Sequence, residues 1–305
     1  MFADVNKLKF SLPVCVALFA FTGTAMADSA EVLQGKYQAL AGALQQNAFK
    51  RPLVLSSNET PGRLTGDVYA LVNQPFTTLG TALTVPEQWC DVISLHMNTK
   101  YCRAVTTSSG SKLLVRIGSK TPEELSQAAR IVFDYSAPAT TPQYMSVALA
   151  AKAGPLGTSD YRIALEAVPL PGGRTFVHLS YSYSVSLVGR IAMQSYLATA
   201  GSGKVGFTVV GQRPDGEPAY VGGVRGVIER NTMRYFVGIE SLLETMPAPP
   251  AARFERRLQS WFAAIERYPL QLHDMELGEY LAMKRAERAR EQSVEPDLGV
   301  QSAAN

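Results

Sequence analysis

The chain has few residues of the kinds that build recognisable reaction centres. Its 305 residues include three cysteines, three histidines and two tryptophans, and the formal net charge is only +3. So small a charge does not indicate a nucleic-acid partner unless Lys and Arg are clustered. Beyond residue 27, charges or prolines interrupt every apolar stretch, so no later segment is expected to cross a membrane. Apolar residues make up 46%, which indicates a folded chain.

Familiar catalytic motifs are also missing. His96, His178 and His273 are far apart, and none belongs to an H-x-x-x-H or H-E-x-x-H pair. There is no G-x-S-x-G nucleophile elbow. The glycine-rich stretch 200–205 has Val205 where a phosphate loop needs Ser or Thr, and it is interpreted as a helix stop. No metal and no cofactor are therefore expected.

The first 27 residues predict an export signal. Lys7 and Lys9 precede the apolar run 12–21, and residues 25–27 read Ala-Met-Ala, a small-residue cleavage pattern. The apolar run is too short to span a bilayer. We therefore expect cleavage near Ala27 and a periplasmic or secreted mature protein.

Two cysteines remain after cleavage, Cys90 and Cys102. An even pair in an oxidising compartment favours a disulfide. His96 lies between them, so a metal pair or free thiols are alternatives, although no fourth metal ligand is apparent.

Hydrophobic periodicity predicts an α+β chain: a curved antiparallel sheet that grips a long C-terminal helix, with extra helices inserted before it. The expected strands are 66–72, 100–106, 112–117, 129–135, 145–151, 160–168 and 174–185. The expected helices are 31–47, 77–83, one that begins at Pro86, 186–199, 224–246 and 251–267. The expected organisation is a signal peptide (1–27), an N-terminal helix and linker (28–62), a main domain (63–268) with a helical insertion (186–246), and a C-terminal extension (269–305) whose residues 287–305 are patternless and expected to be disordered.

This order of elements resembles the START-like, Bet v1-type helix-grip superfamily. Strand 66–72, the short helices 75–83 and 86–91, the strands through Tyr183 and the closing helix 251–267 carry the resemblance. It implies a hydrophobic cavity whose partner is an apolar small molecule or lipid, with transient membrane contact. A minority of the superfamily are cyclases or hydrolases.

Charged and aromatic residues in these elements are the candidate ligand-binding residues. Strand alternation places the charged ones either in solvent or in the cavity, where they would orient a polar head group. The candidates are Arg116, Asp134, Arg162, Glu166, His178, Tyr181, Tyr183 and Trp261.

Segment 224–246 carries a dense polar group that includes Arg225, Arg230 and Arg234. The repulsion between Arg230 and Arg234, four residues apart, is tolerated more easily beside anions or acidic residues. This polar group is the candidate surface site for binding a lipid head group or a partner; the alternative is that it is a face exposed to solvent.

Three functions are compatible with these features. The first is an exported START-like protein that shields or transfers a hydrophobic ligand. The second is an enzyme on the same scaffold that acts on an apolar substrate, with His178, Glu166 and Asp134 as acid–base groups. The third is a non-catalytic envelope assembly factor that uses the arginine-rich helix.

Overall fold

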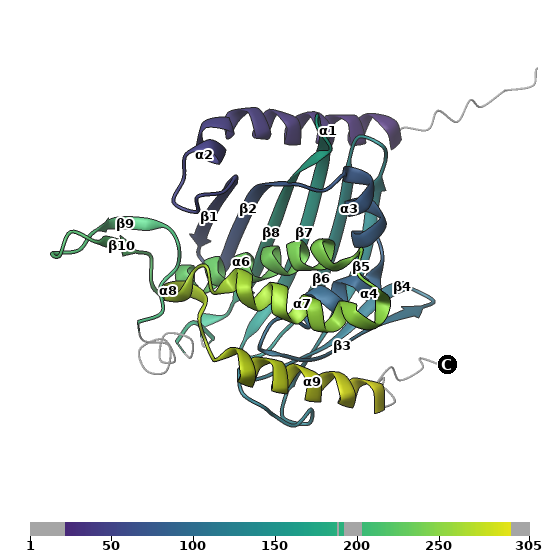
Figure 1. Cartoon of the computed structure of the whole chain (residues 1–305), viewed down its shortest axis with the longest axis vertical. Helices are drawn as coiled ribbons and strands as arrows, with labels where there is room; N and C mark the ends of the chain where they lie inside the picture. The colour runs from purple at the N-terminus through teal and green to yellow at the C-terminus, as the bar shows by residue number, and fades with distance from the viewer. Residues whose placement is uncertain (1–21, 188, 192–202, 294–305) are drawn as a thin grey trace, which may run out of the picture.

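A computed structural model describes residues 22–187, 189–191 and 203–293 (Figure 1). Eight strands form one antiparallel sheet in the order β1-β2-β8-β7-β6-β5-β4-β3. They are β1 (Leu53–Thr60), β2 (Arg63–Val72), β3 (Thr99–Thr107), β4 (Gly110–Ile117), β5 (Ala129–Thr140), β6 (Met145–Ala153), β7 (Thr158–Leu170) and β8 (Arg174–Val185). The seven expected strands and the α+β fold class are confirmed. Strand β1 was not expected, because its mostly polar residues lie in the segment interpreted as a linker.

Period-two alternation separates the two faces of the sheet. In β8, Val177 and Leu179 are buried on the inner face, whereas His178 lies on the outer face. Gly172 and Gly173 both have positive φ and close the hairpin between β7 and β8, a geometry that glycine adopts without steric cost.

Two short helices, α3 (Phe76–Leu83) and α4 (Pro86–Ile93), connect β2 to β3 across the inner face of the sheet. Pro86 stands in the first turn of α4, where a missing N–H costs nothing. The buried Trp89 ring donates a hydrogen bond of 2.7 Å from Nε1 to the carbonyl of Leu83 and so fixes α4 against α3. Both helices were expected from the sequence.

The helix that lies on the sheet is α6 (Gly223–Thr245), not the expected closing helix 251–267. Figure 1 shows α6 crossing the sheet, with α7 (Pro250–Ile265) packed over it as a second layer. A Cβ atom on Gly66 of β2 would lie only 2.3 Å from Thr232 Oγ1 of α6, so the two backbones approach closely. A helix between two layers is buried on nearly all sides, whereas the single apolar stripe of α7 fits an outer layer.

Two further helices occupy the opposite, outer face at one end of the sheet. They are α1 (Thr22–Ala39) and α2 (Ala41–Gln45). Leu33 and Leu44 join Val168 and Phe176 in a small second core. The expected helix 31–47 is therefore present as two helices. Of the expected signal peptide 1–27, residues 1–21 lie outside the described residues, and residues 22–27 belong to the first turns of α1. Most of the expected helix 186–199 also lies outside the described residues.

The C-terminal extension contains α8 (Pro269–Leu272) and α9 (Leu277–Ser293). Helix α9 packs beside β3, an edge strand of the sheet. The expectation of disorder from residue 287 is wrong for 287–293, and residues 294–305 lie outside the described part of the chain. The segment carries many charges, but Lys284 and Glu287 are buried and form an ion pair of 2.8 Å. Because such charged residues are usually exposed, the composition of this segment does not indicate that it packs as a helix.

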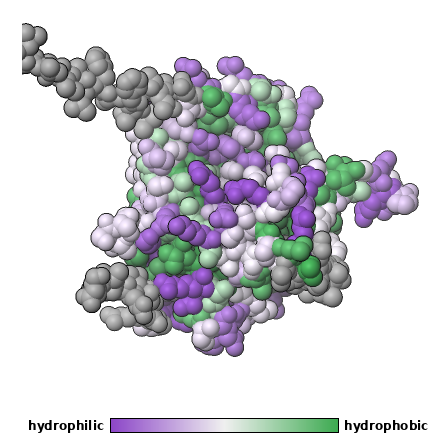
Figure 2. Space-filling view, turned by 180° about the vertical axis from the view of Figure 1, so that it is seen from behind, coloured by the Kyte–Doolittle hydropathy of each residue, from purple (hydrophilic) through white to green (hydrophobic). Residues whose placement is uncertain are grey.

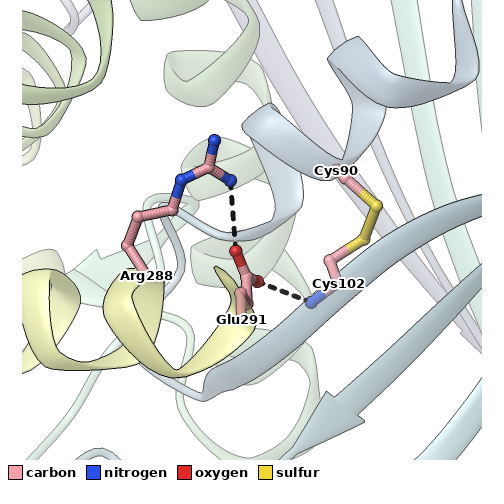
Figure 3. The surroundings of a disulfide bond; sticks show 4 residues. All are labelled: Cys90, Cys102, Arg288 and Glu291. Atoms are coloured by element: carbon pink, nitrogen blue, oxygen red, sulfur yellow. Dashed lines mark hydrogen bonds and ion pairs between the residues drawn. A yellow bond between two sulfur atoms is a disulfide. The ribbon is translucent and has the colours of Figure 1, made fainter. Parts of the chain in front are cut away.

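The disulfide between Cys90 of α4 and Cys102 of β3 is confirmed, and it lies next to α9 (Figure 3). Glu291 of α9 accepts a hydrogen bond of 3.0 Å from the backbone N–H of Cys102. Arg288, one turn earlier, donates to the same carboxylate over 3.2 Å. The covalent link and the helix therefore stabilise the same edge of the sheet.

A second hairpin, β9 (Val209–Gln212) with β10 (Pro218–Tyr220), projects from the body (Figures 1 and 2). Figure 2 shows it hydrophobic near its base and hydrophilic at its tip. Val209 and Val210 are exposed there. None of the described helices is long and apolar enough to cross a membrane.

Candidate functional site

Side chains fill the inner face of the sheet beneath α6. The rings of Tyr161 and Tyr183 stack with centroids 5.3 Å apart, and those of Tyr181 and Tyr235 meet edge to face at 5.2 Å. Tyr181 and Tyr183 are buried in this cluster. The cavity expected beneath a closing helix is therefore filled by side chains where α6 crosses the sheet.

Trp261, a candidate ligand residue, also lies in packed interior. Its ring stacks on Tyr280 of α9 with centroids 5.2 Å apart. Its Nε1 donates to the carbonyl of Arg234 over 3.2 Å. Trp261 therefore joins α7 to both α6 and α9.

An open groove of about 820 Å³ lies between α9 and the loop 121–127. Its apolar lining residues are Pro122, Met275, Ala282, Met283 and Ala286. Its charged lining residues are Glu123, Glu124, Glu279, Glu287 and Arg290. We name it the α9 groove. The groove could not be predicted from the sequence, because it is formed by α9, and the charged composition of the C-terminal segment did not indicate a packed helix.

A cationic cluster adjoins one end of the α9 groove. Asp274, which precedes the groove residue Met275, accepts ion pairs from Arg234 at 2.5 Å, Lys120 at 2.6 Å and Lys204 at 3.5 Å. Burial would raise the pKa of Asp274, but the three cations outweigh it and lower that pKa to about 2. Asp274 is therefore ionised at neutral pH. We name these four residues the Asp274 cluster.

Buried His96 lies near the same cluster. Burial lowers the pKa of His96 well below its usual value, and the positive charges of Arg234, Lys120 and Lys284 lower it further. His96 is therefore neutral at physiological pH. Its Nε2 lies 3.4 Å from Asn231 Oδ1. Cys90 and Cys102 are joined to each other in the disulfide, so neither sulfur is a free thiolate that could bind a metal together with His96.

His178 and Glu166 meet on the outer face of the sheet. His178 Nε2 lies 2.8 Å from Asp67 Oδ1, and its Nδ1 lies 3.2 Å from Glu166 Oε2. Tyr69 stacks on the imidazole with centroids 4.2 Å apart, and Tyr144 donates its hydroxyl to Glu166. Although burial opposes it, hydrogen bonds to Asp67 and Glu166 raise the pKa of His178. Both ring nitrogens are engaged, so this imidazole has no free position for a substrate proton.

We predict that His178→Gln lowers the free energy of unfolding by about 2 kcal/mol at pH 5.5, because two hydrogen bonds to charged groups are lost. The folded-state pKa is raised, so the contribution is complete below the unfolded value of about 6.5 and is lost as pH rises through the folded value. Urea unfolding of both proteins from pH 5.5 to 9 measures the difference.

Comparing the two proteins cancels the opposite acid response of His96, which both retain. A double variant, Asp67→Asn with Glu166→Gln, provides the control, because it removes the partners that raise the pKa of His178. In that background His178→Gln should show little pH dependence. An effect of His178→Gln that grows toward alkaline pH would contradict the assignment.

The other charged strand candidates are dispersed. Arg116 donates to the carbonyl of Ala128 over 3.3 Å. Asp134 pairs with Lys112 on the exposed outer face, separate from His178. Arg162 shares the outer face with Glu166 and helps to lower the pKa of that carboxyl, after the hydrogen bond from His178. The structure therefore joins Glu166, His178 and Arg162, but not Asp134 or Arg116.

The polar group on α6 does not form a solvated face. Arg230 and Arg234 are buried, and Arg225 is half-buried against Ser57 of β1, to which it donates over 3.0 Å. Buried Glu229 accepts backbone hydrogen bonds from Phe207 and Thr208. The expectation of a surface patch is wrong for Arg230 and Arg234, because α7 and the loops beside α6 cover that side of the helix.

Comparisons with known proteins give structural matches only; no protein-family model and no curated protein sequence matches the chain. A START superfamily protein from Mycobacterium smegmatis is 15% identical, with a TM-score of 0.31 over 45% of this chain and 92% of its own. Human StAR-related lipid transfer protein 5 is 10% identical, with a TM-score of 0.35; the match covers 73% of this chain and 99% of the human protein. Truncated norcoclaurine synthase from Thalictrum flavum is 13% identical, with a TM-score of 0.30; the match covers 47% of this chain and 89% of the synthase.

These TM-scores lie below 0.5, so the fold assignment rests on topology. The two short helices between β2 and β3, the antiparallel order from β2 through β8 to β3, and a later helix across the sheet match the expected resemblance. The α+β helix-grip fold predicted from the sequence is therefore confirmed, with α6 in place of the helix 251–267 on the sheet.

Proposed function

We propose that this chain is an exported protein that binds a hydrophobic or amphipathic small molecule, such as a lipid, for shielding or transfer. The α9 groove carries the proposal. Its volume of about 820 Å³ lies within the usual range of small-molecule sites, roughly 300–1,000 Å³. Its apolar floor and charged rim suit a ligand that is partly apolar.

Two observations support export. Residues 1–27 carry the charge, apolar run and small-residue motif of a signal peptide. The Cys90–Cys102 disulfide is of a kind that persists in oxidising compartments and is rare in the cytosol.

The alternative of an enzyme has less support. Both imidazole nitrogens of His178 contact carboxylates, and Asp134 pairs elsewhere with Lys112. A general base needs an accessible proton-accepting atom beside its substrate. Binding without catalysis is therefore the function we favour.

A neutral acyl chain with a fluorescent label tests the groove. Ala286→Trp places a large ring in the groove, and we expect it to weaken probe binding at least tenfold. Ala289→Trp is the matched control, because Ala289 is exposed on the same helix and does not line the groove. Equal loss in both variants, or no loss in either, would reject the groove as the binding site. Mass spectrometry of molecules that co-purify with the native protein would identify the ligand.

A further inference from the structure

We propose that the Asp274 cluster binds a phosphate group. This inference rests on the proposed function in one respect only: it assigns the phosphate to the head of the molecule whose apolar part lies in the α9 groove. Binding of phosphate by the cluster itself stands on the contacts and charges of its four residues.

The cluster has more positive than negative charge. Lys120, Lys204 and Arg234 share the carboxylate of Asp274, which leaves an excess of two positive charges among these four residues. A phosphomonoester carries a charge of about −1.5 to −2 at neutral pH. A bound phosphate would therefore offset the positive charge that these four residues carry together.

The positions of the side chains suit a group that approaches from solvent. Arg234 and Asp274 are each only 3% exposed and form the floor of the cluster. The side chains of Lys120 and Lys204 are 32% and 33% exposed. Both ammonium groups contact the same Asp274 oxygen, Oδ1, so the carboxylate holds them close together. Two adjacent ammonium groups can donate to different oxygens of one phosphate.

The local potential is positive beyond the cluster itself. Burial lowers the pKa of Lys120, and the nearby charge of Arg234 lowers it further, against the opposing effect of Asp274. The same cations contribute to the lowered pKa of His96. An added anion near Lys120 would therefore stabilise its charged ammonium form.

The place of the cluster fits an amphipathic ligand. Lys120 directly precedes Thr121, and Asp274 directly precedes Met275, and both of those neighbours line the α9 groove. Four glutamates, Glu123, Glu124, Glu279 and Glu287, also line the groove and disfavour an anion there. Glu123 accepts a hydrogen bond of 2.6 Å from the backbone N–H of Ser119, which directly precedes Lys120. A ligand with a phosphate head and an acyl tail would place its head at the Asp274 cluster and its tail over the apolar floor.

Inorganic phosphate is the first probe, titrated calorimetrically into the mature protein in a phosphate-free buffer at pH 7.5. Lys120→Gln and Lys204→Gln should each weaken binding at least tenfold. Lys152→Gln, which removes an exposed lysine from the end of β6, should leave binding unchanged. Sodium chloride at the same ionic strength should not compete. Equal affinity in all three variants, or equal competition by chloride, would overturn the proposal.

Vesicles distinguish the two sources of phosphate. Phosphatidylcholine vesicles with and without phosphatidic acid are compared by co-sedimentation. Binding that needs phosphatidic acid and Lys120 supports a lipid head group. Inorganic phosphate binding with no vesicle binding supports a soluble phosphate compound. The neutral acyl probe separates this inference from the proposed function, because Lys120→Gln should leave its affinity unchanged, whereas Ala286→Trp should leave inorganic phosphate binding unchanged.

Discussion

Replacement of Asp274 with Asn is expected to lower the free energy of unfolding by about 3–5 kcal/mol, the usual cost of removing one partner from a buried ion pair. The amide keeps the shape of the side chain but removes the charge shared by Arg234, Lys120 and Lys204. The loss of the ion pair with Arg234 is expected to contribute most, because the Arg234 guanidinium is buried and cannot be hydrated unless the structure opens.

Urea unfolding at pH 7.5 in phosphate-free buffer measures the effect. Asp215→Asn is the matched control, since Asp215 is exposed and lies 3.6 Å from Arg213; its loss should cost at most about 1 kcal/mol. The pKa of Asp274 is lowered, so its stabilisation is complete above the unfolded value of about 3.9 and is lost as pH falls toward 2. A loss of less than 1 kcal/mol in Asp274→Asn would show that the cluster does not depend on this carboxylate.

Trp261→Ala is expected to cost about 3–5 kcal/mol, as truncations of large buried aromatic residues do. The variant removes the contact with Tyr280 and the hydrogen bond to the carbonyl of Arg234, and it leaves a cavity between α6, α7 and α9. Thermal and urea unfolding measure the loss.

The conservative variant Trp261→Phe separates packing from ligand contact. It keeps an aromatic ring but loses the indole N–H, so a smaller loss of stability is expected. Because Trp261 does not line the α9 groove, Trp261→Phe should bind the neutral acyl probe with unchanged affinity. A selective fall in affinity with stability retained would restore Trp261 to the ligand site that its sequence position first indicated.

Most of the strands were predictable from period-two alternation of buried residues, whereas the mostly polar β1 was not. The alternation that buries Val177 and Leu179 of β8 follows directly from the pleat, and it recurs in β2, β6 and β7. The start of α4 was predictable from Pro86, because proline is favoured in the first turn of a helix. Local signals of this kind need no knowledge of distant contacts.

The layering of the helices was not predictable, because it depends on which polar residues find buried partners. Helix α7 has one apolar stripe, a pattern that predicts the helix gripped by the sheet, whereas α6 carries Glu229 and Arg230. Those charges are satisfied by backbone groups at residues 205–208, far away in sequence. Composition alone assigns such residues to solvent.

The Asp274 cluster was missed for a related reason. Its residues come from the β4–β5 loop, the segment before β9, helix α6 and the loop after α8. No spacing within one segment relates Lys120, Lys204 and Arg234 to Asp274. The meeting of Glu166 with His178, by contrast, follows from hairpin register, because the two are directly paired across β7 and β8.

The partnership of α9 with β3 also has a consequence for biosynthesis. Cys102 and the glutamate that accepts its backbone N–H are 189 residues apart in sequence. Strand β3 is synthesised well before α9, so this edge of the sheet lacks its helix while the residues between them are being made. Unpaired sheet margins invite intermolecular pairing. The nascent chain is therefore exposed to intermolecular pairing at β3 in the interval before α9 is made.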